Sequence, residues 1–104
     1  DAYHYVETSD IAFFYSEEKV VFLHTFSDKR YIVDYTLEQI EQLLDERTFF
    51  RVSRNCIANI NSIRKISKYF NSRLKLSFQP ECPHEVLISR VRVPDFLKWV
   101  DGGL

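Results

Sequence analysis

The stretch IRKISKYFNSRLKLSF, residues 63–78, is the part of the chain that decides its fold. Its second half alternates apolar with polar side chains, and a period of two is typical of a strand with one buried face. The apolar positions are Leu74, Leu76 and Phe78, and the positions between them are Arg73, Lys75 and Ser77. Asn71 and Ser72 are turn-forming residues. We therefore predict an antiparallel hairpin with arms Ile63–Phe70 and Arg73–Phe78, one face of which is cationic.

Further short strands are predicted on both sides of this hairpin. Val20–Phe26 is rich in β-branched and aromatic residues, and Ile11–Tyr15 is a short apolar run suited to a buried strand. The other segments are Arg30–Asp34, Phe49–Val52, Cys56–Ile60 and Glu85–Ile88, and Tyr3–Val6 alternates weakly. Short strands with short connections predict a mainly β fold, with small antiparallel β-sheets of about ten short strands.

Two short helices complete the expected architecture. Thr36 and Gln39 fit a capping box, in which each side chain satisfies a free backbone N–H of the first helical turn. Apolar residues at helical spacing follow, which predicts a short central helix of about two turns that seals one side of the β structure. These residues are Leu37, Ile40, Leu43 and Leu44. Pro94–Val100 is predicted to form a short C-terminal helix that packs through Phe96, Trp99 and Val100.

Length and composition indicate one globular domain. A chain of 104 residues is enough for a single unit, 1–104, and too short for two. No apolar run approaches the roughly 18 residues of a membrane span and no signal pattern opens the chain, so we expect a cytoplasmic location. The chain contains no Met, and we expect a module excised from the C-terminal part of a longer protein. Cys56 and Cys82 are expected to be reduced thiols, with Cys56 buried.

Charge is distributed unevenly along the chain. The net charge is only −1, which by itself argues against nucleic acid as a partner. Residues 1–48, however, hold 11 acidic and 4 basic residues, a balance of −7, whereas residues 49–104 hold 4 acidic and 10 basic residues, a balance of +6. Such segregation can produce a one-sided field that attracts a polyanion. The other interpretation is that the two halves pair with each other, and charge alone does not decide between them.

The sequence offers little support for an enzyme. His4, His24 and His84 are scattered, and none lies at metal-ligand spacing from another His, Cys or carboxylate, so no metal site is predicted. We expect His24 to be structural or simply exposed. The chain has no glycine-rich loop for a phosphate and no nucleophile elbow, so neither a cofactor nor catalysis is expected. Glu17 and Glu18 are adjacent on a turn and are interpreted as solvated.

The segment Phe49–Asn59 carries the most informative polar residues. Arg54 and Asn55 fall where the strand pattern breaks, so they should project from a loop or strand end. Arg is the commonest reader of guanine edges and Asn can pair with adenine, which favours a DNA contact for Arg54. For Arg51 we favour an ion pair at the edge of the core, and for Asn59 the capping of a turn.

The same segment resembles a known family. The pattern Phe49-Phe50-Arg51-x-x-Arg54-x-x-Ile57-x-Asn59-x-x-x-Ile63-x-x-Ile66 is similar to the central motif of the LytTR family of bacterial DNA-binding domains, the output domains of response regulators. Three weaker similarities occur in the right order: Asp10-Ile11-x-Phe13-Phe14, Tyr31 to Leu44, and Ile88-Ser89-Arg90. The closing Phe96-x-x-Trp99 also resembles a branch common in response regulators. The resemblance covers nearly all of the chain.

The resemblance implies DNA binding without a recognition helix, in which loops and strand ends enter successive major grooves. By position it implies three contact regions: an early hairpin (Glu17–Val21), a central zone (Ser53, Arg54 and Asn55) and a late zone (Ser89–Arg92, with Arg90 and Arg92). In the early hairpin Glu17 and Glu18 would face phosphates unfavourably, which leaves Lys19 as the contact. Ser53 stands where many members carry His.

The leading hypothesis is sequence-specific binding of double-stranded DNA by the output domain of a bacterial two-component transcription regulator. An upstream receiver domain is expected in the full-length chain, and two copies are expected to occupy repeated half-sites in a promoter. Arg54, Asn55 and Arg90 are expected to read or frame bases. Lys19, Lys68, Arg73 and Arg92 are expected to contact phosphate.

Two other functions are compatible with the sequence. One is a β-rich protein-interaction or ligand-binding module whose basic face meets an acidic partner. The other is a single-stranded nucleic-acid binder that stacks bases on Tyr69 and Phe70. Against the second, we expect those two rings to pack into the core.

Overall fold

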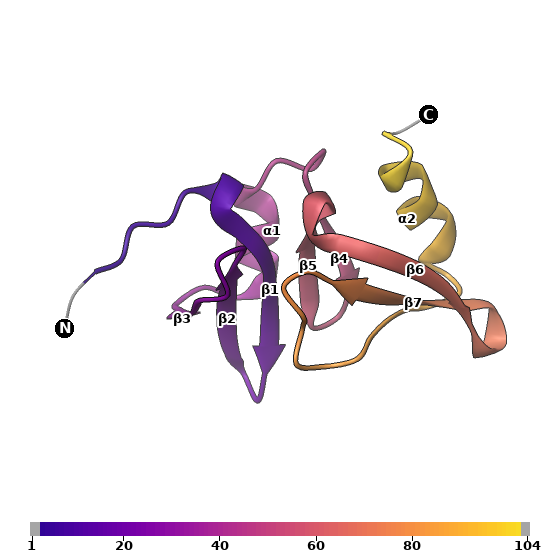
Figure 1. Cartoon of the computed structure of the whole chain (residues 1–104), viewed down its shortest axis with the longest axis horizontal. Coiled ribbons are helices and arrows are strands. Elements are labelled where there is room, and N and C mark those ends of the chain that lie inside the picture. The colour runs from indigo at the N-terminus through magenta and orange to yellow at the C-terminus, as the bar shows by residue number, and fades with distance from the viewer. Residues whose placement is uncertain (1–2, 103–104) are drawn as a thin grey trace.

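The computed structural model describes residues 3–102, which form two antiparallel sheets and two short α-helices (Figure 1). The strand order is β3-β2-β1-β5-β4 in the larger sheet and β6-β7-β8 in the smaller one. The strands are β1 (Ile11–Glu17), β2 (Val20–Thr25), β3 (Arg30–Val33), β4 (Phe49–Ser53), β5 (Cys56–Asn59), β6 (Ile63–Tyr69), β7 (Arg73–Phe78) and β8 (Val86–Ile88); the helices are α1 (Leu37–Leu43) and α2 (Val93–Val100). The predicted mainly β fold is confirmed, with eight strands within residues 3–102.

The larger sheet has one core on each face. One core contains Leu37 and Ile40 of α1 together with Phe14, Phe49 and Ile57 of the sheet. The other lies beneath the smaller sheet and α2, and its members include Phe13, Val52, Cys56, Leu76, Phe78, Ile88, Phe96 and Trp99. Because β1, β4 and β5 are covered on both sides, their sequences are nearly continuous apolar runs and lack strict alternation.

Alternation along β4 decides where its one charged residue lies. Phe49 packs in the core beneath α1, and Phe50 and Val52 pack on the opposite face. Arg51 therefore shares the α1 face with Phe49. The β4–β5 register shifts between Arg51 and Ser53, where β4 has one residue more than β5. A shift of this kind bends the strand and redirects the residues that follow it.

The connections between strands are tight turns with unusual backbone angles. Glu18 and Lys19 join β1 to β2, and both have positive φ, at 50° and 69°. Two consecutive residues of this kind match the right-handed twist of a hairpin, although side-chain-bearing residues adopt the conformation at some cost. Asn71 and Ser72, at φ 59° and 60°, close the β6–β7 hairpin, which confirms the turn predicted from their sequence.

The helices form where the sequence predicts them. Thr36 and Gln39 make both hydrogen bonds of the capping box, at 3.1 Å and 2.9 Å. In α2, Phe96 and Trp99 are buried, Val100 packs against the same core, and Asp95 occupies the first turn. The Trp99 indole Nε1 donates a 3.1 Å hydrogen bond to the Arg47 carbonyl, which fastens α2 to the chain before β4.

Three expectations about apolar residues are wrong. Tyr3–Val6 forms no strand, and both of its tyrosines are exposed. Leu43, the last residue of α1, is 71% exposed because it lies to the side of the helix face formed by Leu37 and Ile40, and Leu44 packs against the core instead. Phe70 is 75% exposed and does not pack into the core, because it occupies the tip of the β6–β7 hairpin, beyond the reach of either core.

Candidate nucleic-acid interface

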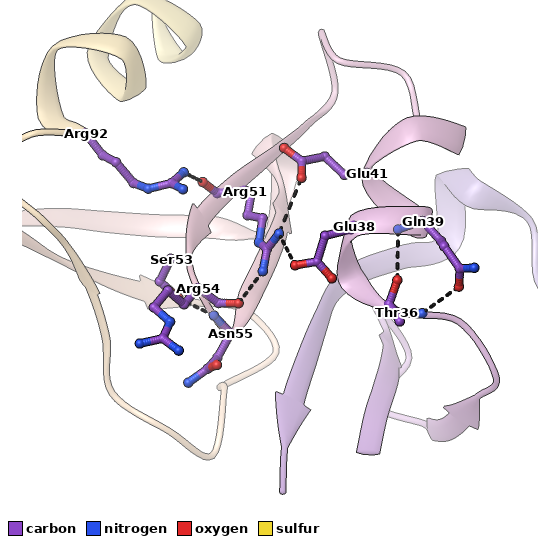
Figure 2. Close-up of polar contacts among 9 residues, drawn as sticks. All are labelled: Thr36, Glu38, Gln39, Glu41, Arg51, Ser53, Arg54, Asn55 and Arg92. Carbon is purple, nitrogen blue, oxygen red and sulfur yellow. Dashed lines mark hydrogen bonds and ion pairs between the residues drawn. The ribbon is translucent and has the colours of Figure 1, made fainter. Parts of the chain in front are cut away.

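The central zone is a tight turn between β4 and β5 whose backbone is held from three directions. Ser16 of β1 donates its N–H to the Asn55 carbonyl at 2.8 Å. The Asn55 N–H donates to the Ser53 hydroxyl at 3.3 Å, and Arg51 Nη2 donates to the Arg54 carbonyl at 2.6 Å (Figure 2). The side chains of Arg54 and Asn55 are exposed, as expected for a strand end, and Figure 2 shows them pointing away from α1. Hydrogen bonds therefore hold the backbone of the turn, while the side chains of Arg54 and Asn55 are exposed to solvent.

Arg51 connects the central zone to α1. Its Nη1 lies 2.9 Å from Glu38 Oε2 and 3.5 Å from Glu41 Oε1, and both carboxylates come from the helix (Figure 2). The Arg51 side chain is only 15% exposed, so these contacts occur at the margin of the core. The predicted ion pair at the core edge is confirmed. Nε of Arg51 is buried and has no hydrogen-bond partner among residues 3–102.

The electrostatic setting of Glu38 keeps this helix contact ionised. A hydrogen bond from its own backbone N–H, and next the hydrogen bond and positive charge of Arg51, hold the pKa of Glu38 below its ordinary value. A carboxylate with a lowered folded pKa contributes stability above its ordinary pKa and loses it as the pH falls through the folded value. The Glu38–Arg51 contact is therefore fully formed at neutral pH and weakens only in acid.

The early hairpin and the central zone line one groove of about 690 Å³. Lys19 contributes from the β1–β2 turn, and Arg54 and Asn55 contribute from the β4–β5 turn. The opposite wall comes from the connection into α1 and includes Tyr35 and Glu38. The structure thus brings together Lys19 and Arg54, which lie 35 residues apart in the chain. The lining thus contains the cations Lys19, Arg51 and Arg54 together with the acids Asp34 and Glu38.

Glu17 of the early hairpin contacts His84 of the loop between β7 and β8. His84 Nε2 lies 3.2 Å from Glu17 Oε2, and the His84 ring stacks on Tyr15 with centroids 4.1 Å apart. Glu18 lies on the turn itself, in keeping with a solvated position. One of the two acids expected to oppose phosphates is thus engaged by the β7–β8 loop.

The late zone begins directly after β8 and leads into α2. Arg90 is exposed in this turn. Arg92 is also exposed, yet its Nη1 donates a 2.7 Å hydrogen bond to the Arg51 carbonyl (Figure 2). The backbone N–H groups of Arg92 and Val93 donate to the Ser89 carbonyl at 3.0 Å and 3.1 Å, which fixes the turn. The central and late zones are therefore joined directly through Arg51 and Arg92.

Lys68 and Arg73 lie apart from these zones. They belong to the outer end of the β6–β7 hairpin, which extends away from the larger sheet at one end of the molecule (Figure 1). Arg73 Nε donates to the Phe70 carbonyl at 3.0 Å, and its guanidinium lies 5.1 Å from the centre of the Tyr69 ring. The exposed Phe70 stands beside them, so this tip combines two cations with an uncovered aromatic ring.

Other polar residues of the segment are structural. Asn59 is buried, its Nδ2 donates to the Ile11 carbonyl at 2.9 Å, and its Oδ1 accepts from the Asn61 N–H at 2.9 Å, which confirms its capping role. His24 is buried against Phe13 and bonds Asp28 at 2.7 Å, so it is structural. Cys56 is buried and both cysteines are free thiols, as predicted.

Sequence reasoning missed the double role of Arg51 and the Arg92 bond to its carbonyl. Strand alternation could have placed Arg51 on the side of α1, since Phe49 is two residues earlier. No local pattern predicts that Arg92 reaches Arg51, because that contact depends on how α2 docks. Between residues 3 and 102 no His, Cys, Asp and Glu gather as a metal-binding group, and no helix is long and apolar enough to cross a membrane.

Two small antiparallel sheets with short helices and exposed cationic turns are the architecture of a mainly β domain. The chain belongs to the LytTr DNA-binding domain family, and the sequence model of that family matches residues 1–101. This is a regulatory family, in agreement with the absence of an enzyme signature in the sequence.

Similar proteins support this assignment. The sensory transduction protein LytT of Bacillus subtilis is 38% identical over 71 residues, which cover 68% of this chain and 29% of LytT. The transcriptional regulatory protein YpdB of Escherichia coli K12 is 30% identical over 88 residues, covering 85% of this chain and 35% of YpdB. The chain thus spans about a third of the length of these curated relatives. A solved LytTr DNA-binding domain from Bacillus cereus shares the fold, with a TM-score of 0.79 at 24% identity over 91% of this chain and 84% of that one.

Proposed function

We propose that this domain binds double-stranded DNA sequence-specifically as the output domain of a bacterial two-component transcription regulator, in the cytoplasm. The observation that carries the proposal is the central zone, where a fixed backbone presents the exposed side chains of Arg54 and Asn55. A base-reading group is most selective when its main chain is held before binding, because less ordering accompanies association.

The contact residues fall into two kinds. Arg54, Asn55 and Arg90 are proposed to read or frame base edges, since their side chains are exposed on turns. Lys19, Lys68, Arg73 and Arg92 are proposed to contact phosphates, and Ser53 assists through its place in the central turn. Because Arg92 already donates to the Arg51 carbonyl through Nη1, only its remaining donors are available to a phosphate.

The larger assembly is also a proposal. The matched residues make up only 29% of LytT and 35% of YpdB, and these two relatives carry names of sensory transduction and transcriptional regulation. We propose a receiver domain upstream in the full-length protein and two copies on repeated half-sites of a promoter. Paired half-sites match two copies in the way that symmetric or tandem DNA-binding proteins commonly match their sites.

A salt-dependence experiment tests duplex binding. Duplexes are selected from a randomised library with the unaltered domain, and the affinity of the best duplex is measured by fluorescence anisotropy at two salt concentrations. We expect affinity to fall steeply with salt and to exceed that for a scrambled duplex by about a thousandfold or more. Equal, salt-independent affinity for both duplexes would show instead a protein-interaction or ligand-binding module.

One observation favours a second candidate function. Phe70 is 75% exposed beside Tyr69 and Arg73, an arrangement that single-stranded nucleic acids use for base stacking. Competition of the selected duplex against its separate strands decides between the two functions. A strand that displaces the duplex, and loses affinity when Phe70→Ala is introduced, would favour single-stranded binding.

A further inference from the structure

We propose that Arg51 is the positioning residue of the DNA-reading turn, and that α1 sets the orientation of Arg54 and Asn55 through its guanidinium. The proposal rests on the function proposed above and goes further, because it assigns a role to a residue that acts on the base readers through their backbone. Its side chain is largely buried and is directed to α1 and to the backbone of the turn (Figure 2).

The guanidinium of Arg51 links α1 to the turn with a fixed geometry. Nη2 donates to the Arg54 carbonyl at 2.6 Å, while Nη1 is bound by Glu38 at 2.9 Å and by Glu41 at 3.5 Å. Because the group is planar and rigid, the directions of its two terminal nitrogens are fixed relative to each other. When the α1 carboxylates fix Nη1, they also fix the direction from which Nη2 meets the Arg54 carbonyl. The peptide plane that follows Arg54, and leads into Asn55, is oriented in the same way.

The capping box of α1 stabilises the helical turn that carries Glu38. Thr36 and Gln39 close the first turn of α1, and Glu38 lies between them in sequence. Leu37 and Ile40 bury the same turn in the core beneath the larger sheet. The carboxylate that holds Arg51 therefore projects from the most constrained part of the helix.

The main chain of Arg51 serves a separate region. Its carbonyl accepts the 2.7 Å hydrogen bond from Arg92 Nη1, so the late zone depends on the backbone of Arg51 and the central zone on its side chain. A Lys at this position keeps the carbonyl and the positive charge, but its single ammonium lacks the fork that spans α1 and the turn. Arg51→Lys should therefore disturb the central zone and leave the late zone intact.

A double-mutant cycle separates positioning from general stabilisation. The variants are Arg51→Lys, Arg54→Ala and their combination, titrated with the selected duplex and with its single-base variants. We expect Arg51→Lys to weaken binding about tenfold and to lose discrimination at the base pairs that Arg54→Ala also ceases to distinguish. In the Arg54→Ala background, Arg51→Lys should no longer change discrimination at the base pairs that Arg54 reads, because that side chain is absent and only the contact of Asn55 remains to be disturbed.

Two further variants protect the test from a folding artefact. Glu38→Gln leaves Arg51 in place and removes one of the two carboxylate charges that hold it, so it should reproduce a weaker form of the same discrimination loss. Arg30→Lys is the matched control: it makes the same exchange on β3, where the guanidinium lies over the Phe22 ring, and it should leave binding unchanged. Thermal unfolding of every variant is measured alongside.

The possible results of the double-mutant cycle can be told apart. Non-additive losses confined to the base pairs read by Arg54 support the proposal. Additive losses, or a uniform weakening across all duplexes that follows the change in melting temperature, would overturn it and leave Arg51 a stabilising ion pair. An unaltered domain that shows no salt-dependent duplex binding would overturn the proposed function itself, a result distinguishable from either of these.

Discussion

Arg92 and Arg51 are 41 residues apart in the chain, yet the guanidinium of the first donates a 2.7 Å hydrogen bond to the carbonyl of the second. This bond joins the turn before α2 to the strand before the central zone. The central and late zones, two of the regions proposed to contact DNA, are therefore parts of one connected surface.

Arg54 is expected to contribute sequence discrimination more than overall attraction. Arg54→Ala should weaken binding to the selected duplex by about 1–3 kcal/mol and relax preference at one or two base pairs. Its melting temperature should stay unchanged, because the side chain is exposed and the Arg54 carbonyl remains available to Arg51. Anisotropy titrations against a panel of single-base variants measure this effect. Unaltered affinity and preference would remove Arg54 from the interface.

Lys19 is expected to act through charge alone. Lys19→Ala should weaken binding to all duplexes by a similar factor and reduce the slope of log affinity against log salt by about one unit. Lys29→Ala provides a matched control, since Lys29 also lies at a β-turn, between β2 and β3, outside the groove that holds Lys19. A slope that changes equally in both variants would contradict a local phosphate contact.

The indole of Trp99 is expected to hold α2 in place. Trp99→Phe keeps an aromatic ring beside Phe50 but removes the Nε1–H donor to the Arg47 carbonyl. Loss of this partly buried hydrogen bond should cost about 0.5–1.5 kcal/mol, which urea unfolding should detect. Trp99→Ala should cost more, about 3–5 kcal/mol, because it also leaves a cavity. Equal stability of Trp99→Phe and the unaltered domain would contradict the structural role of that bond.

The buried thiol of Cys56 predicts a loss of stability at alkaline pH. Burial, and next the nearby Cys82, raise the pKa of Cys56 well above its ordinary value. For a group whose folded pKa is raised, the stability contribution is complete below the unfolded pKa and is lost as the pH rises through the folded value. The free energy of unfolding should therefore decline above the ordinary thiol range, and Cys56→Ala should flatten this decline.

Alkylation provides an independent measurement of the same residue. At neutral pH Cys82, which is only partly buried, should react with iodoacetamide well before Cys56. Because burial also raises the pKa of Cys82, its reaction should be slower than that of a free cysteine. Rapid modification of Cys56 in the folded domain would contradict its predicted inaccessibility.

The sequence was most informative where a local pattern determines the structure. The alternation of residues 73–78, the capping box at Thr36 and the turn at Asn71-Ser72 each involve neighbours in the chain, and each is confirmed. The exposure of Arg54 and Asn55 follows from the same kind of reasoning, since the strand pattern breaks there.

The sequence was least informative where distant elements meet. Leu43 fits the apolar spacing of α1, but Leu44 and not Leu43 meets the core formed with the larger sheet. Phe70 resembles a core residue by composition, and only the length of the β6–β7 hairpin shows that it lies beyond both cores. The groove shared by Lys19 and Arg54 depends on β1 pairing with β5, a long-range register that periodicity does not reveal.

The backbone angles of the β1–β2 turn have a consequence for protein engineering. Glu18 and Lys19 adopt left-handed conformations that glycine and asparagine adopt more easily. Replacing the pair with Asn-Gly should therefore raise the melting temperature while it deletes the Lys19 charge. Thermal robustness and DNA affinity would then move in opposite directions in a single variant. The β1–β2 turn is therefore a position where a designer could gain stability wherever DNA binding is not required.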